Sequence, residues 1–169
     1  MPFKQLSHQE IQNAERRFPI VLVLDRFQSP ENAGMAFRVA EGFGVERILS
    51  VGTGIELENK RLQRTARETA SRIPSEWMVD AKRVAALKED GYVLIGLEIT
   101  DQSVALSEFD FSQHKKIALV LGSERQGIAP ELLKLLDYAV AIPMYGKNSS
   151  LNVISALSIA LYAITESIK

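Results

Sequence analysis

The stretch IPMYGKNSSLNVISALSIALYAI, from Ile142 to Ile164, joins the end of an apolar strand to a strongly apolar helix. A run of small and polar residues, Gly146 to Ser150, separates the two. Ser149 or Ser150 can cap the helix by accepting hydrogen bonds from its free backbone N–H groups. The question is why polar groups gather at the start of one of the most apolar helices of the chain.

The helix accounts for only part of this stretch. One apolar stripe has helical spacing and predicts a core face, and it consists of Leu151, Ile154, Leu157, Leu161 and Ile164. A smoother side that suits close packing consists of Ala156, Ala160 and Ala163. Neither explains Asn148 and Asn152 beside the cap, or Gly146, whose backbone is free to curl round a ligand. We therefore expect a binding loop here.

Outward from this stretch, apolar runs alternate with helical patterns along the whole chain. Strands are expected at Ile20–Leu24, Ile48–Val51, Val93–Leu97, Ile117–Leu121 and Ala139–Ile142, with a weaker candidate at Trp77–Val79. Helices are expected at Ser7–Arg17, Pro30–Gly42, Glu58–Ser71, Ala81–Glu89 and Pro130–Leu136, and from Leu151 to the end. This alternation predicts an α/β fold with a mainly parallel, doubly wound sheet. Ligands bind such sheets beyond the carboxyl ends of the strands.

Composition bounds the class of protein. The 169 residues suit one domain, residues 1–169, and the 46% hydrophobic and 24% charged residues are a globular balance. The lack of cysteine excludes disulfides and thiolate chemistry. The two histidines, His8 and His114, are too few and too far apart to suggest a metal site. No apolar run has membrane-spanning length and no signal peptide begins the chain, so we expect a cytoplasmic protein without a membrane partner.

The loop after the first strand reads DRFQSPENAGMAFRVAEGFGV. Ser29 followed by proline is a good helix start. Gly34 lies one turn before Arg38, and because glycine inside a helix costs about 1 kcal/mol relative to alanine, it predicts that something approaches there. The competing interpretation is that Arg38 pairs with Glu41 on a solvated surface.

A second loop, LVLGSERQGIAPELL, runs from a buried strand into Gly122. It resembles a phosphate loop only in outline, because Ile128 and Ala129 stand where lysine and a hydroxyl residue would be needed. The GxGxxG fingerprint is absent from the chain, so nucleoside triphosphate and dinucleotide sites are weakly supported. Glu124 is either a functional carboxylate or an ordinary solvated turn residue.

Together the three loops resemble the motifs of the TrmH-type branch of the SPOUT RNA methyltransferases. The first motif matches Asn32-x-Gly34-x-x-x-Arg38, the second Leu119 to Glu124 with Gly127, and the third Ile142-Pro143-Met144 through Ser150-Leu151-Asn152-Val153. They occur in the family's order and span most of the chain. One departure is Arg125, where the family often has a small residue.

The resemblance implies transfer of a methyl group from S-adenosylmethionine to a ribose 2′-hydroxyl of RNA. It also implies a C-terminal deep trefoil knot, which topology rules alone would argue against. Implied cofactor-binding residues are Leu97, Gly122, Ile142, Met144, Ser150 and Leu151. Implied catalytic residues are Arg38, Asn32, Glu124, Ser150 and Asn152. The arginine would hold a phosphate and stabilise the developing alkoxide, because its pKa of about 12.5–13.8 makes it a poor proton acceptor.

The resemblance also implies RNA and a second copy of the chain as partners. With a net charge of −1, RNA must be held by a local patch, and the best patch is Asn59–Arg72. The expected RNA-binding residues are Arg38, Arg61, Arg64 and Arg125. A solvated helix with Glu68 as a local partner is the plainer interpretation of the patch. In the family the arginine can act in the partner's site, which implies a homodimer.

The sequence carries no dedicated RNA-binding domain, which favours transfer RNA over ribosomal RNA as the substrate. Two other classes of function stay open. One is a knotted RNA- or nucleotide-binding module without catalysis, against which the intact motif residues argue. The other is a small-molecule α/β enzyme that uses Glu124.

Overall fold

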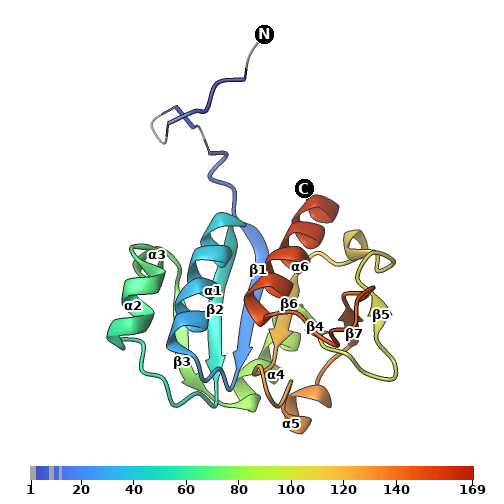
Figure 1. The fold of residues 1–169 in the computed structure, drawn as a ribbon. Helices are drawn as coiled ribbons and strands as arrows, with labels where there is room; N and C mark the ends of the chain where they lie inside the picture. Colours follow the sequence, from blue (N-terminus) through green and yellow to red (C-terminus); the bar gives the residue numbers. More distant parts are fainter. Residues whose placement is uncertain (1–2, 8–9, 12) are drawn as a thin grey trace.

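The computed structural model describes residues 3–7, 10–11 and 13–169. Its centre is one parallel sheet of seven strands in the order β3-β2-β1-β6-β4-β7-β5 (Figure 1). The strands are β1 (Phe18–Asp25), β2 (Val45–Val51), β3 (Ser75–Val79), β4 (Val93–Leu97), β5 (Val104–Ala105), β6 (Ile117–Leu121) and β7 (Tyr138–Ala141). Because all pairs are parallel, the carboxyl ends of the strands meet at one edge of the sheet.

Helices cover both faces of the sheet, and each face has its own core. They are α1 (Pro30–Gly42), α2 (Lys60–Ala66), α3 (Thr69–Arg72), α4 (Ala81–Glu89), α5 (Pro130–Leu133), α6 (Val153–Ile168) and the 3₁₀ helix η1 (Phe111–Gln113). Along β1, Leu22 belongs to the core under α1 and α6, whereas Val21 and Val23 belong to the core under α4. Burial on both faces explains why the central strands are continuously apolar.

The mainly parallel α/β sheet predicted from the sequence is confirmed. β4, β6, α1 and α4 have the predicted bounds, and β3, the weaker candidate, is present at the edge of the sheet. No strand was expected at β5, which has two residues and, among the described residues, pairs with β7 alone.

Three helix predictions need correction. Residues 13–17 are not helical, and their chain runs directly into β1; the rest of Ser7–Arg17 is non-helical where it is described, and His8 lies outside the described residues. The expected helix Glu58–Ser71 is broken at Arg67, which has a positive φ of 56°. α5 ends at Leu133 and not at Leu136. Within the described part of the chain, no helix is long and apolar enough to cross a membrane.

Candidate functional site

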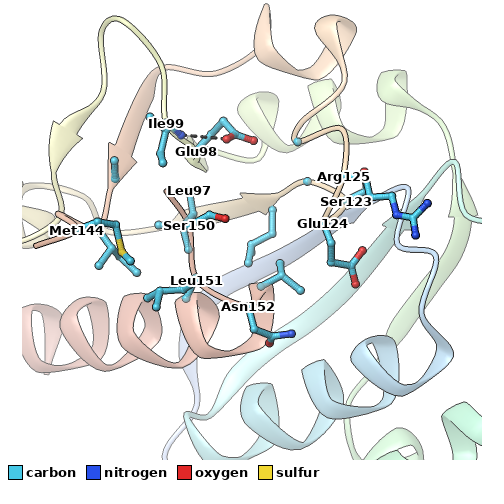
Figure 2. A pocket seen from close by; sticks show the side chains of 17 residues that line it. Leu97, Glu98, Ile99, Ser123, Glu124, Arg125, Met144, Ser150, Leu151 and Asn152 are labelled. Atoms are coloured by element: carbon cyan, nitrogen blue, oxygen red, sulfur yellow. Dashed lines mark hydrogen bonds between the residues drawn. The ribbon is translucent and has the colours of Figure 1, made fainter. Parts of the chain in front are cut away.

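A cavity of about 390 Å³ opens at the carboxyl ends of β4, β6 and β7, beside the start of α6 (Figure 2). Three chain segments line it: one follows β4, the second follows β6, and the third runs from the end of β7 into α6. This is the edge at which parallel α/β sheets bind ligands. The cavity therefore lies where the strand order predicts a site.

All six residues expected to bind a cofactor line this one cavity. They are Leu97, Gly122, Ile142, Met144, Ser150 and Leu151. Three of the expected catalytic residues line it as well, namely Glu124, Ser150 and Asn152. The second and third motifs, which are far apart in sequence, thus line one space of the size of a small-molecule site.

The wall that follows β6 is a tight hairpin. Ser123 and Gly127 exchange two backbone hydrogen bonds, of 3.2 and 3.0 Å, and Gln126 N–H donates to the Ser123 hydroxyl at 3.2 Å. Gly122 packs so closely on this turn that a Cβ there would overlap the backbone of Gly127 and Ile128. The glycine is therefore required by the turn itself, whatever the cavity holds.

Two carboxylates hold the far end of this hairpin. Glu98 accepts a hydrogen bond from Ile128 N–H at 3.0 Å, and Asp25 accepts one from Ala129 N–H at 2.6 Å. Glu98 also accepts from its neighbour Ile99 N–H at 3.0 Å (Figure 2). Two consecutive backbone donors are thus bound by acids at the ends of β4 and β1. Charge-assisted hydrogen bonds of this kind are stronger than neutral ones.

Asp25 is the more buried of the two acids, with 1% of its surface exposed. Burial raises the pKa of Asp25, while the bond from Ala129 and the neighbouring Arg26 oppose that rise. Its Oδ1 atom has no hydrogen-bond partner among the described residues. Arg26 in turn donates to Gln126 and to the carbonyl of Gly127, both at 3.2 Å. Burying this carboxyl group costs desolvation energy, and in return the group helps to hold the hairpin in place.

Neither Asp25 nor Glu98 was identified as a site residue from the sequence. Each is a carboxylate placed directly after a buried strand, in VLVLD and VLIGLE. That position alone was the available signal, because strand ends at this edge of the sheet surround the cavity.

Asn32 connects the first motif to the second. It lies in the first turn of α1, where its N–H donates to the N-cap Ser29 at 3.1 Å. Its side-chain amide donates to the Glu124 carboxylate on the hairpin. The prediction that Ser29 and Pro30 begin the helix is confirmed.

Arg38 does not line the cavity, although it lies on the same helix as Asn32. Its side chain is exposed, and its only close polar contact among the described residues is a weak one of 3.9 Å to the sulfur of Met35. The alternative interpretation, in which Arg38 pairs with Glu41, is wrong, because Glu41 lies 3.6 Å from Arg72. A guanidinium without a carboxylate partner is available to an external anion.

The prediction that something approaches Gly34 is confirmed, but what approaches is the neighbouring helix α2. A Cβ at this position would lie 2.5 Å from the Leu62 carbonyl oxygen and 2.9 Å from the Thr65 Cβ. Gly34 is buried where α1 crosses α2, so its role is close helix packing and not open space beside Arg38.

The third motif forms the opposite wall of the cavity. Asn152, and not Ser149 or Ser150, is the N-cap of α6, and it accepts from Ile154 N–H at 2.9 Å and Ser155 N–H at 3.4 Å. The predicted core stripe is buried from Ile154 onward, whereas Leu151 precedes the helix and is 39% exposed. Of the alanine side, Ala160 is fully buried within the chain, whereas Ala156 and Ala163 are half-buried.

The expected RNA-binding arginines fall in three places. Arg125 lines the cavity on the hairpin. Arg61 and Arg64 are exposed on α2, where Arg61 is 3.9 Å from Glu31. The break at Arg67 removes that residue from the helix face, and Glu68 pairs with Arg72 at 2.6 Å. The continuous basic helix expected over Asn59–Arg72 is therefore shorter, with two of its arginines available. No group of three metal-binding side chains occurs in the described ranges.

The chain is similar in sequence to a family of RNA-modifying enzymes. The sequence model of the SpoU rRNA Methylase family matches residues 19–162. The chain is 29% identical over 147 residues to an uncharacterized tRNA/rRNA methyltransferase of Synechocystis, covering 86% of this chain and 38% of the relative. It is 29% identical to the tRNA (guanosine(18)-2′-O)-methyltransferase of Escherichia coli K12, covering 88% of this chain and 64% of that protein.

A ribosomal-RNA enzyme is equally similar. The 23S rRNA (uridine(2479)-2′-O)-methyltransferase of Streptomyces viridochromogenes is 31% identical, covering 83% of this chain and 50% of the relative. The crystal structure of the SpoU methyltransferase AviRb from the same organism, in complex with AdoMet, matches with a TM-score of 0.80 and 25% identity over 98% of this chain and 65% of that one. The chain thus spans between about a third and two thirds of the curated relatives it matches.

Proposed function

The chain belongs to the SpoU rRNA Methylase family, and from that premise we propose that it is an RNA methyltransferase. It would transfer the methyl group of S-adenosylmethionine to a ribose 2′-hydroxyl of RNA. The observation that carries this proposal is that the second and third motifs line one cavity at the carboxyl edge of the sheet, while Asn32 of the first motif donates to the cavity residue Glu124. Residues 19–162, the family match, include every residue of that cavity.

The cavity suits S-adenosylmethionine in both shape and chemistry. Its volume of about 390 Å³ lies within the usual range of roughly 300–1,000 Å³ for small-molecule sites. Leu97, Ile142 and Leu151 offer apolar surface to an adenine ring. The segment from Met144 to Leu151 leaves backbone groups free for its polar edges. Glu98 and Ser150 add side-chain oxygens for ribose hydroxyls.

The chemistry requires position and electrostatics more than proton transfer. The cofactor supplies an already activated methyl group. The ribose oxygen forms the new bond to that methyl carbon while the bond from carbon to sulfur breaks, and the hydroxyl proton leaves to water. Arg38 would hold the neighbouring phosphate and stabilise the negative charge that develops on the oxygen. Glu124, oriented by Asn32, would accept a hydrogen bond from the target ribose.

Arg38 lies outside the cavity of its own chain, so the proposal includes a homodimer in which it reaches the partner's cavity. Two large apolar residues on α6 support such an interface, since Ile159 is 42% and Tyr162 is 60% exposed. α6 packs beside α1, the helix that carries Arg38 (Figure 1). An interface on α6 would therefore lie close to this arginine.

The strand order supports a knotted C-terminal segment. β7 lies between β4 and β5, although the chain passes through β5 and β6 before it reaches β7. To enter that position, residues after β6 must pass the loop that connects β4 to β6 through β5. We propose that residues from β7 to α6 thread this loop and form the trefoil knot. The loops of the knot would then form the cofactor cavity.

For the substrate we propose transfer RNA ahead of ribosomal RNA, with Arg61, Arg64 and Arg125 among its phosphate contacts. The relatives include enzymes for both RNA classes. The decisive experiment is methyl transfer from radiolabelled S-adenosylmethionine to separated transfer and ribosomal RNA, followed by nucleoside mass spectrometry. The expected product is a 2′-O-methylated nucleoside.

The same methyl-transfer assay on the Arg38→Ala variant tests the role proposed for this arginine. Loss of an alkoxide-stabilising donor typically lowers the rate by about 10²–10³-fold, and we expect at least that loss with cofactor affinity retained. A methylated base in place of a methylated ribose would contradict the proposed reaction. Cofactor binding without any transfer would instead support a non-catalytic RNA-binding module.

A further inference from the structure

A second cavity, of about 370 Å³, lies at the opposite end of the sheet from the first. It is formed by the chain at the start of β1, by residues in and after η1, and by the end of α6. Figure 1 shows the start of β1 and the end of α6 at this same end of the sheet. Its polar lining consists of Arg16, Arg17, Ser112, His114, Lys115, Ser167 and Lys169. No motif of the methyltransferase family includes these residues.

Four basic side chains line this cavity, namely Arg16, Arg17, Lys115 and Lys169. None of the described residues that line it is an aspartate or a glutamate. The side chains of Arg16 and Lys115 have no hydrogen bond or ion pair with any described residue. Two acids lie beside the lining: Asp110 accepts from Ser112 and Gln113, and Glu166 pairs with Lys169. The unpaired positive charge of the cavity therefore belongs to Arg16, Arg17 and Lys115. The chain as a whole has a net charge of −1, so this concentration of cations is local.

Two of these cations, Arg16 and Arg17, are also held in place. Arg17 donates to the carbonyl of Val45 at 2.7 Å and to that of Arg72 at 3.2 Å. The guanidinium of Arg16 lies over the ring of Phe18, 4.6 Å from its centroid. Phe18 N–H binds the Gly44 carbonyl at 2.8 Å, which fixes this segment to the sheet. A cavity whose cations are ordered in advance loses less side-chain entropy when it binds an anion.

We propose that this cavity binds a backbone phosphate of the substrate RNA, at a distance from the methylated nucleotide. Arginine and lysine around a concave surface bind phosphate through charge-assisted hydrogen bonds. β1 has eight residues and separates the two cavities, so an RNA that uses both must extend over about 25 Å. The inference rests on the proposed function, since the occupant is the RNA that this function requires.

The test is the double variant Arg16→Ala with Lys115→Ala, compared with Lys82→Ala with Lys134→Ala. The control pair removes the same charge from α4 and from the end of α5, where neither side chain has a hydrogen-bond partner among the described residues. Binding of fluorescein-labelled bulk transfer RNA and ribosomal RNA is measured by anisotropy over a range of salt concentrations. Affinity for S-adenosylmethionine is measured in parallel.

We expect the test variant to bind RNA about tenfold more weakly than the control. The slope of log affinity against log salt should fall by about 0.7–0.9 for each lost phosphate contact. Cofactor affinity should be unchanged in both variants.

Other results separate the failure of this inference from that of the proposed function. RNA binding by the test variant equal to that of the control, while the wild type methylates RNA, would overturn the phosphate site alone. Absence of both RNA binding and methyl transfer in the wild type would overturn the two together. A shift of the His114 ring resonances by inorganic phosphate at micromolar concentration would show a site for a small anion and overturn the RNA assignment.

Discussion

The two walls of the cavity at the carboxyl edge of the sheet differ in how they are held. The hairpin after β6, called the tied wall below, is held by two internal backbone hydrogen bonds. It is also held by hydrogen bonds to Glu98, Asp25 and Arg26. The segment from Pro143 to Leu151 makes no hydrogen bond to any other described residue, and Tyr145 within it is 98% exposed. Ordering a backbone costs roughly 1–2 kcal/mol per residue. We infer that the first wall is ordered in advance and that the second becomes ordered around the cofactor.

The largest effect is expected when a glycine in each wall is replaced by alanine. A Cβ at Gly122 would overlap the backbone of the tied wall, whereas Gly146 on the other wall has no atom within 4 Å of that position. Gly122→Ala should weaken S-adenosylmethionine binding by about 100-fold or more, because forced backbone shifts cost about 1–3 kcal/mol or more. Gly146→Ala should stay within about threefold of the wild type. Isothermal titration measures both, and equal affinities would refute the asymmetry.

Glu98 provides a smaller test on the tied wall. Glu98→Gln keeps the shape but loses the charge that binds Ile128 N–H. Since a hydrogen bond to a charged group contributes about 1.5–3 kcal/mol, we expect cofactor affinity to fall about tenfold. Glu108→Gln is the matched control, because this acid is exposed and its side chain accepts no hydrogen bond from the described residues. Unchanged affinity in Glu98→Gln would mean that Asp25 and Arg26 suffice to hold the hairpin.

The same contrast explains what the sequence could predict. Local signals such as a Ser-Pro helix start and a continuous apolar run gave the bounds of α1 and β4. The three loops and the fold class followed from the order of these elements. The two-residue β5 and the break at Arg67 carry no such local signal, because neighbouring elements and not their own residues determine them.

Within the site, the errors have one physical cause. Gly34 and Arg38 were interpreted along one helix, but the neighbour that requires the glycine is α2, which follows a separate strand. The acids Asp25 and Glu98 act on residues 104 and 30 positions away in sequence. Contacts across such separations become visible only in the folded chain.

Asp25 makes the tied wall sensitive to pH. Because burial raises the pKa of Asp25, the folded chain binds this proton more tightly than the unfolded chain. Its contribution to the free energy of unfolding is therefore full below the unfolded pKa of about 3.9 and is lost as pH rises through the raised folded-state pKa. Asp25→Asn should lack this decline. Denaturant unfolding between about pH 4 and pH 8 measures it, and parallel curves for the two proteins would contradict the assignment.

The smallest effect is expected at Asn152, where the segment Pro143–Leu151 joins α6. Asn152 caps α6 through two backbone N–H groups, whereas Ser150, two residues earlier, is exposed and makes no hydrogen bond to a described residue. Asn152→Ala should lower the free energy of unfolding by about 1 kcal/mol, because an unpaired cap exposes the first turn of the helix. Ser150→Ala should leave it unchanged within about 0.5 kcal/mol. Both are measured by chemical denaturation without cofactor, so that a role of either residue in binding does not contribute. If the two variants lose the same stability, the serine shares the cap, and the segment before α6 is more ordered than its lack of hydrogen bonds indicates.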